Sequence, residues 1–306
     1  MKLIGDVGGT KTLLALVDEA GQIREKRRLA SADFHAFEEL LAAFLGDVSA
    51  PIEGGCLVVA GPVADDGRRA KITNLPWIID AEALERRFGL TGLRLANDFV
   101  GVAVGAVRST PAERLVLQAG VPKPEGVKLV LGAGTGLGMA IVCHGRVLAS
   151  EGGHVAFAPQ DEDELRLWQA LAAEHGRVTA ERVISGPGLA NIHRLLAAET
   201  CDPAEIVARA RQGNAAARRT LEVFFQAYGA FAGDMALAVL ATGGVFLAGG
   251  VTQHLLPELA ASGFLAAFNA KAEHAALMTR MPVEALTDAE IGLKGAAHLA
   301  VGTTID

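Results

Sequence analysis

The sequence contains few cysteines, and their spacing argues against the structures that cysteine most often supports. Cys56, Cys143 and Cys201 are the only three in 306 residues, and no two of them form a C-x-x-C pair. An odd number of widely spaced thiols predicts neither a disulfide framework nor a zinc site, and it indicates a reducing compartment. We therefore expect the protein in the cytoplasm.

The sequence also lacks an excess of basic residues. It has 28 Lys and Arg against 35 Asp and Glu, a net charge of −7 and a pI of about 5.7. This balance disfavours non-specific binding to nucleic acid or to anionic membranes, so neither is expected as a partner.

A leader segment and a membrane span are not expected either. No basic segment followed by an apolar one opens the chain, which argues against a secretory signal. The most apolar long stretch, residues 223–241, contains Gln226, Asp234 and two glycines. This composition favours a buried helix over a span.

Glycine is abundant, and its first cluster follows a short apolar run at the start of the chain. The segment Gly5-Asp6-Val7-Gly8-Gly9-Thr10 lies between Leu3-Ile4 and a second apolar run over 12–17, which predicts a β-hairpin with a glycine-rich turn. Glycine permits positive φ and close approach to a ligand, and successive N–H groups in such a turn can bind an anion. A carboxylate beside a phosphate repels it unless a cation lies between them, so Asp6 suggests Mg²⁺. The alternative is a plain hairpin without ligand.

A second glycine cluster repeats this pattern. Gly132-Ala133-Gly134-Thr135-Gly136-Leu137-Gly138 lies between the predicted strands 127–131 and 139–143. Neither loop fits a standard nucleotide fingerprint, since position 10 is not Gly as a P-loop needs and position 137 is not Gly as G-x-G-x-x-G needs. The more specific hypothesis is that the two hairpin loops hold one polyphosphate between duplicated domains.

Candidate polar groups follow predicted strands. Asn97 and Asp98 follow the strand 93–96, and strands that alternate with helices predict an open α/β sheet with ligands at the carboxyl ends of its strands. The alternative is that Asp98 only caps the helix that follows. Glu151 and His154 flank a Gly-Gly turn and suit hydrogen bonds to sugar hydroxyls, unless they belong to an ordinary surface loop.

Gly249 and Gly250 close the predicted strand that begins at Val245. A flat ring such as adenine can lie against backbone without side chains, although an ordinary turn from strand to helix explains the pair equally well. The remaining C-terminal half is predicted to be mostly helical, with Ser185-Gly186-Pro187-Gly188 as a break between helices. Residues 108–126 are rich in proline and predict the crossing to a second domain.

Taken together, the motifs resemble those of the bacterial glucokinases, which belong to the superfamily of hexokinases, actin and heat-shock-chaperone ATPases. The resemblance spans the whole chain, because the matching motifs lie in order along it, at residues 5–10, 96–99, 132–138, 151–155, 181–189 and 248–251. It implies a two-domain actin-like ATPase (ribonuclease H-like) α/β fold with a duplicated hairpin unit and an interdomain cleft. The implied domains are 1–108 with the C-terminal stretch 287–306, and 109–286.

The resemblance also implies an activity, namely ATP-dependent phosphorylation of glucose at its 6-hydroxyl by a cytoplasmic homodimer. Asp98 resembles the general base, and Asn97, Glu151, His154 and Glu181 resemble the other sugar ligands. The residues that resemble the ATP site are Gly5, Asp6, Val7, Gly8, Gly9, Thr10, Gly134, Thr135, Gly136, Gly249 and Gly250. Asp6 is expected to hold Mg²⁺ through water.

The sequence departs from one related group of proteins, and several alternative functions stay open. The zinc-containing group of repressors and sugar kinases carries a cysteine-rich motif after its sugar-binding His, whereas here no cysteine follows His154 before Cys201. A kinase for mannose, fructose or an amino sugar would use the same polar ligands. A sugar-sensing regulator, a chaperone-like ATPase and an inactive paralogue are further alternatives. We expect neither the DNA-reading segment nor the peptide-binding module that the first two need.

Overall fold

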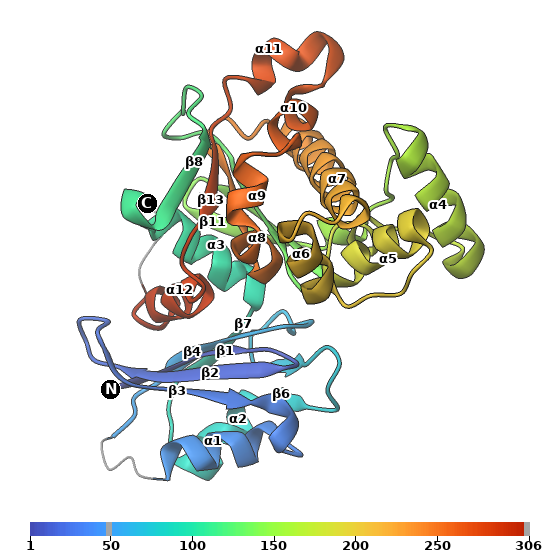
Figure 1. Ribbon diagram of the computed structural model, residues 1–306. Coiled ribbons are helices and arrows are strands. Elements are labelled where there is room, and N and C mark those ends of the chain that lie inside the picture. The colour runs from blue at the N-terminus through green and yellow to red at the C-terminus, as the bar shows by residue number, and fades with distance from the viewer. Residues whose placement is uncertain (47–50, 303–306) are drawn as a thin grey trace. The chain divides into compact units, whose positions relative to one another are not determined.

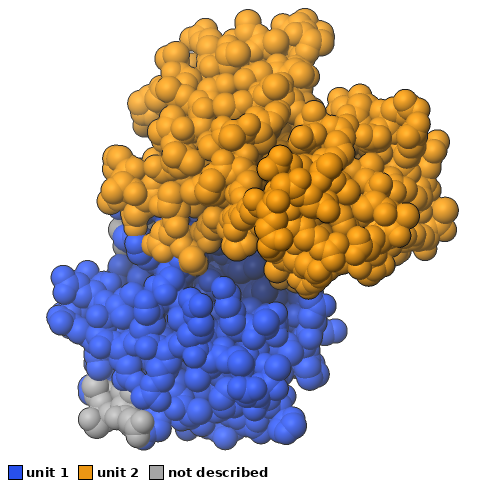
Figure 2. Space-filling view, viewed as in Figure 1, with its two compact units in different colours: residues 1–109, 145–149, 290–306 blue, residues 110–144, 150–289 orange. Residues whose placement is uncertain are grey.

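The computed structural model describes residues 1–46 and 51–302, and the chain groups into two compact units (Figures 1 and 2). Unit 1 contains residues 1–109, 145–149 and 290–306, and unit 2 contains residues 110–144 and 150–289. The last four residues of the predicted C-terminal stretch 287–306 lie outside the described residues. Each unit has a large hydrophobic cluster of its own.

Unit 1 contains a five-stranded sheet with the order β3-β2-β1-β4-β7. Its strands are β1 (Lys2–Val7), β2 (Lys11–Val17), β3 (Ile23–Ala30), β4 (Gly55–Val59) and β7 (Leu93–Asn97). β1 and β2 form the predicted antiparallel hairpin, and β4 lies parallel to both β1 and β7. The carboxyl ends of β1, β4 and β7 therefore meet at one edge, where open α/β sheets bind ligands.

Helices cover both faces of this sheet (Figure 1). They are α1 (Phe37–Leu45), α2 (Ala81–Phe88), α3 (Asp98–Arg108) and α12 (Ile291–Ala300), and a short ladder of β5 (Arg69–Lys71) and β6 (Ile78–Asp80) adjoins them. Side chains of one face join α1 and α2 in one cluster, and side chains of the other face join α12. Because both faces are covered, β1, β2 and β4 are buried along almost their whole length rather than at alternate residues.

The C-terminal helix α12 packs closely against α3. A Cβ at Gly295 would lie 1.8 Å from the carbonyl oxygen of Gly101, and one at Gly105 would lie 2.2 Å from that of Ile291. The glycines of both helices therefore permit an approach that any larger residue would block.

The second sheet has six strands in the order β11-β10-β9-β12-β13-β8. The strands are β8 (Arg114–Gln118), β9 (Lys128–Ala133), β10 (Leu137–Cys143), β11 (Arg146–Ser150), β12 (Gly244–Ala248) and β13 (Val283–Leu286). β9 and β10 form an antiparallel hairpin, and β12 lies parallel to β9, so this sheet repeats the hairpin and parallel neighbour of unit 1.

Most of the remaining chain is helical, as predicted. The helices of unit 2 are α4 (Glu162–His175), α5 (Gly186–Ala197), α6 (Pro203–Arg211), α7 (Ala215–Val239), α8 (Gly250–His254), α9 (Leu256–Ala260), α10 (Phe264–Asn269) and α11 (Ala275–Met278). Short 3-10 turns complete the structure at Ser31–Asp33, Pro111–Glu113, Gly152–His154, Ala180–Arg182 and Ala272–His274. In the part of the chain that the structure describes, no helix has the length and apolar character of a membrane span.

One local prediction is wrong, and one strand was not predicted. The segment Ser185–Gly188 does not separate helices but begins α5, because the Ser185 hydroxyl accepts a hydrogen bond from Gly188 N at 3.0 Å and Pro187 fits the first turn. The proline-rich crossing 108–126 contains strand β8, which the sequence pattern did not reveal because its burial does not alternate.

Candidate functional site

The first glycine loop joins β1 to β2 and leaves two backbone donors open. Gly8 N donates to Lys11 O at 3.0 Å, and Ser31 N donates to Thr10 O at 3.1 Å. Within residues 1–46 and 51–302, the N–H groups of Gly9 and Thr10 have no hydrogen-bond acceptor. A turn with unpaired N–H groups at its tip is suited to an anion.

The glycines of this loop serve close packing rather than a left-handed backbone, since none of them has a positive φ. Gly5 lies inside β1, and a Cβ there would be 2.6 Å from Leu14 Cδ2. A Cβ at Gly8 or Gly9 would lie 3.0 Å from a backbone carbonyl oxygen, that of Lys11 or Thr73. Val7 is buried at the end of β1, and Thr10 is exposed at the tip of the loop.

Asp6 lies just before this loop and fits a magnesium ion. Burial raises the pKa of its carboxyl to about 6, while the charge of Lys11 acts in the opposite direction. A Cβ at Gly292 would lie 3.0 Å from Asp6 Oδ2, so glycine at this position leaves the carboxylate room for a ligand.

The chemistry of the donor set agrees with this fit. Mg²⁺ is usually held by one or two carboxylates, several waters and the phosphates of the substrate. Among the described residues, no group of three or more His, Cys, Asp or Glu could form a cage for a metal made of protein ligands alone. A partly dehydrated carboxylate beside an anion-binding loop needs a cation, so Asp6 fits Mg²⁺ shared with water and phosphate.

Asn97 and Asp98 lie at the same edge of the sheet of unit 1. Asp6 on β1 is paired with Val58 on β4, and Val58 with Ala96 on β7, so Asp98 follows two residues beyond this register. Neighbouring strands are about 4.8 Å apart. The sheet thus brings together the glycine loop, Asp6 and the predicted general base.

The two residues differ in what they do for α3. Asn97 is the N-cap, whose Oδ1 accepts from Phe99 N at 2.9 Å and whose Nδ2 donates to Gly61 O at 3.3 Å. Asp98 is the first helical residue, is half-buried, and its Oδ1 accepts from the same N–H at 2.9 Å. Helix α3 therefore has a cap without Asp98, which weakens the alternative that capping explains this aspartate.

The second glycine loop, between β9 and β10, is tied to two other segments of unit 2. Gly186 N, at the start of α5, donates to Gly134 O at 2.8 Å, and Leu137 N donates to Glu181 Oε2 at 2.9 Å. A Cβ at Gly136 would lie 2.5 Å from that carboxylate oxygen, which explains glycine at this position. Thr135 is exposed at the tip.

Gly249 and Gly250 form the turn from β12 into α8 beside this loop. Gly249 has a φ of 91°, and a Cβ there would lie 2.3 Å from Ala133 O, so both conformation and space require glycine. Gly250 has open space where a Cβ would be, and its N lies 3.9 Å from the corresponding position of Gly134. The turn at Gly249 and Gly250, next to Gly134 of the second glycine loop, therefore presents backbone without side chains, against which a nucleotide could lie.

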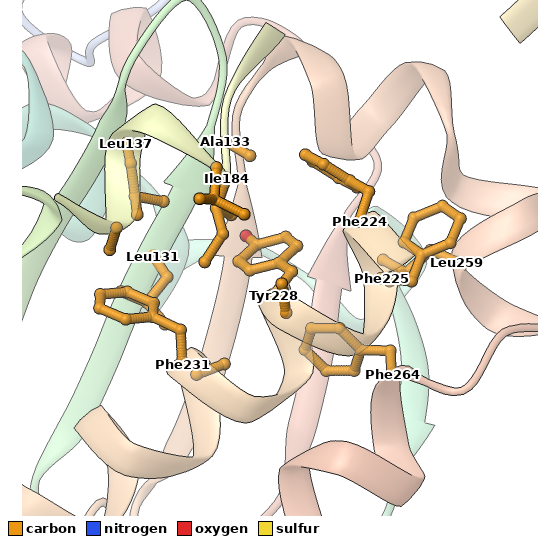
Figure 3. Close-up of a cluster of buried hydrophobic side chains, with 14 of the residues drawn as sticks. Leu131, Ala133, Leu137, Ile184, Phe224, Phe225, Tyr228, Phe231, Leu259 and Phe264 are labelled. Atoms are coloured by element: carbon orange, nitrogen blue, oxygen red, sulfur yellow. The ribbon is translucent and has the colours of Figure 1, made fainter. Parts of the chain in front are cut away.

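Two features of unit 2 were not predicted from the sequence: the start of α5 and the side chain that lies beneath the second glycine loop. The signal for the former was Ser185 followed by proline, a helix start. Beneath the loop lies Tyr228, whose hydroxyl has the Ala133 backbone and Thr252 Oγ1, at 3.4 Å, as hydrogen-bond partners. Burial raises the pKa of Tyr228 to about 12. Figure 3 shows its hydroxyl directed towards Ala133 among the aromatic rings of α7.

Glu151, His154 and Glu181, the predicted sugar ligands of unit 2, lie together. His154 Nε2 is 3.8 Å from Glu151 Oε2, and its Nδ1 is 4.0 Å from Glu181 Oε1. These distances exceed those of hydrogen bonds, and the side chains of His154 and Glu151 are 56% and 83% exposed. Three such groups with space between them can hydrogen-bond the hydroxyls of a ligand.

The Gly-Gly turn between Glu151 and His154 explains how they are placed. A Cβ at Gly152 would lie 2.2 Å from Met139 Sδ, and one at Gly153 would lie 1.9 Å from Leu137 O. The turn therefore lies directly on β10, next to the second glycine loop.

Comparison with known proteins identifies the family. A family model described as "Glucokinase" matches residues 3–303. The chain belongs to the glucokinase family. The glucokinase of Stenotrophomonas maltophilia (strain K279a) is 38% identical over 325 residues, which cover 99% of this chain and 96% of that protein. The predicted membership is thus confirmed.

Solved structures agree on the fold of this glucokinase-family chain. The crystal structure of a glucokinase from an Antarctic psychrotroph has a TM-score of 0.84 and 30% identity, and covers 98% of each chain. A ROK family glucokinase from Streptomyces griseus, in complex with glucose and AMPPNP, has a TM-score of 0.68 and 22% identity and covers 98% of each chain. The predicted actin-like ATPase fold is confirmed.

Proposed function

We propose that this glucokinase-family enzyme transfers the γ-phosphoryl group of ATP to the 6-hydroxyl of glucose, giving glucose 6-phosphate and ADP. The observation that carries the proposal is the shared sheet edge of unit 1, where Asp98 follows β7 and the glycine loop follows β1. A neighbour of the same fold was solved with glucose and AMPPNP, which supports both substrates.

Binding of ATP is assigned to backbone groups. The N–H groups of the loops 5–10 and 134–136 would donate to phosphate oxygens, and the turn at 249–250 would lie against the adenosine. Mg²⁺, when bound, offsets the negative charge of the phosphates, and Asp6 would hold it through water. Phosphoryl transfer needs such positioning and neutralisation more than covalent chemistry with the protein.

Asp98 acts as the general base in this proposal. Its carboxylate accepts the proton of the sugar hydroxyl as the bond between that oxygen and the γ-phosphorus forms. The bond from the γ-phosphorus to the bridging oxygen breaks, and ADP leaves with the electron pair. Asn97, Glu151, His154 and Glu181 bind sugar hydroxyls. Because water is chemically similar to a hydroxyl group, selectivity requires that sugar contacts complete the site.

We further propose a cytoplasmic homodimer with domains 1–108 plus 287–306 and 109–286, and no nucleic-acid or membrane partner. The net charge of −7 supports the last point. A molecular mass in solution near twice 31.7 kDa would support the dimer.

The decisive experiment is a coupled assay for ADP release with glucose, mannose, fructose and no added sugar. We expect glucose to give the highest kcat/KM and the sample without sugar to release ADP only slowly. A higher kcat/KM with another hexose would favour the alternative of a different hexose kinase. ADP release that no sugar stimulates would contradict a kinase and favour a sugar sensor or an inactive paralogue.

A further inference from the structure

A buried pair of hydroxyl groups lies beneath the first glycine loop. Ser31 follows β3, Thr12 is the second residue of β2, and both have an exposed fraction of 0%. Their hydroxyl oxygens are 3.0 Å apart, and Ser31 Oγ donates to the carbonyl oxygen of Gly8 at 2.7 Å. Neither residue belongs to a glycine motif or to the proposed site.

The direction of these hydrogen bonds follows from the number of protons. A serine hydroxyl has one proton to donate, and that of Ser31 goes to Gly8 O. Thr12 must therefore donate its own proton to Ser31 Oγ. The backbone N–H of Ser31 adds a bond to Thr10 O at 3.1 Å, so Ser31 holds two carbonyl groups of the loop.

This arrangement orients the donors of the loop. In a planar trans peptide the C=O and the N–H point in opposite directions. Gly8 C=O and Gly9 N–H belong to the same peptide, so a carbonyl held towards Ser31 directs the Gly9 N–H away from Ser31. That N–H has no acceptor among the described residues. The Ser31 hydroxyl therefore sets the direction of a donor that is open to a ligand.

We propose that Ser31, supported by Thr12, is a positioning residue for the phosphate chain of ATP. It acts through the Gly8–Gly9 peptide and does not touch the nucleotide. The proposal rests on the proposed function in one respect, that the loop binds phosphate.

The test compares two ligands that differ only in phosphate. Titration calorimetry measures the affinity of the full-length protein for ATP and for adenosine in wild type, Ser31→Ala and Thr12→Val. We expect Ser31→Ala to raise the Kd for ATP about three- to tenfold, the range for one lost hydrogen bond. The Kd for adenosine should stay unchanged. Thr12→Val should have a smaller effect of the same kind, and Thr12→Ser should restore ATP binding.

Thr220→Val is the matched control. Thr220 also has an exposed fraction of 0%, and its hydroxyl donates to Ala216 O at 2.9 Å and lies 2.9 Å from His193 Nδ1. The control therefore loses a buried hydroxyl of α7 that has one partner on α7, Ala216, and one on α5, His193. We expect it to lower the melting temperature without changing the Kd for ATP.

Three outcomes would overturn the proposal: an unchanged Kd for ATP in Ser31→Ala, equal weakening of ATP and adenosine, or an equal effect of Thr220→Val. If Ser31→Ala fails to fold, the pair Thr12→Val and Thr12→Ser decides the matter by the same comparison. A wild-type protein that binds no ATP would instead refute the proposed function, which keeps the two failures apart.

Discussion

The cap of helix α3 and the proposed general base are two different residues, Asn97 and its neighbour Asp98. Asn97 caps α3 and reaches Gly61 across the sheet edge, while Asp98 presents a half-buried carboxyl at the same edge. Asparagine and aspartate are equally good N-caps. Replacement of aspartate by asparagine therefore separates proton transfer from capping.

We predict that Asp98→Asn lowers kcat by at least ~100-fold, the lower bound for loss of a general base, while ATP still binds. Asp80→Asn is the matched control, because Asp80 also links a strand to a helix in unit 1 and its Oδ1 accepts from Ala83 N at 3.0 Å. It should keep near-normal activity. Steady-state kinetics of both variants give the answer, and a kcat for Asp98→Asn within about threefold of wild type would rule out the general base.

Residues of the candidate site could be predicted from the sequence only where short-range chemistry marks them. The glycine loops and Asp98 follow apolar strands, so the pattern marks them as candidates, whereas only the resemblance to the glucokinases implies that Asp98 is the general base. Ser31 and Tyr228 could not be found in this way, because their contacts with Gly8 and Ala133 join segments distant in the sequence. The glycines were predicted for flexibility, yet Gly5 is required by packing against Leu14.

At the scale of elements, helix α4 begins with an unusual carboxyl group. Glu164 is 1% exposed, its carboxylate accepts from Gln160 N at 2.7 Å, and its N–H donates to Asp161 Oδ1 at 2.9 Å. Burial raises the pKa of Glu164 to about 7, the bond from Gln160 opposes the shift, and the charge of Asp161 adds to it.

This pKa predicts how stability depends on pH. Between the ordinary value of 4.5 and about 7, folded Glu164 keeps a proton that the unfolded chain releases, so the free energy of unfolding falls as pH rises through this window. Glu164→Gln copies the protonated form and should be more stable than wild type at pH 8, by about 3 kcal/mol as an upper bound, with little difference at pH 4.

Denaturant unfolding at both pH values measures this difference. Glu162→Gln is the control, because Glu162 lies in the same turn with a side chain that is 78% exposed, and its ion pair with Arg166 contributes little. If the free energy of unfolding changed with pH by the same amount in wild type and in Glu164→Gln, the proton on Glu164 would have no effect on stability.

The sequence predicted elements well where a cap or a strong period marked them. Helix α6 runs from Pro203, a residue suited to a first helical turn, to Arg211, and Asn214 caps α7 through Ala217 N. Strand β8 was missed because all but one of its residues are half-buried at the edge of the sheet, so no alternation marks it. The start of α5 was mistaken for a break because Gly and Pro favour both.

At the scale of the whole molecule, binding of the proposed sugar should stabilise the fold. A ligand that binds only the folded state at 100 times its Kd adds about 2.7 kcal/mol, which for a chain of 306 residues corresponds to a rise in melting temperature of about 4 °C. We expect D-glucose to produce this rise and L-glucose, its mirror image, to produce none. Equal shifts with both sugars in a thermal unfolding assay would indicate a general solute effect and contradict a sugar site.

The packing of α12 has a consequence for biosynthesis. Leu293 and Ala296 share a cluster with Ile4 and Val58, which are synthesised long before α12. At roughly 5–20 residues per second, the ribosome needs about 10 to 40 s to pass from the end of β7 to α12. Throughout that interval the apolar side chains that α12 covers, Ile4 and Val58 among them, lack this helix. The apolar side chains of these strands therefore stay accessible to chaperones, and to misassembly, until α12 has been synthesised.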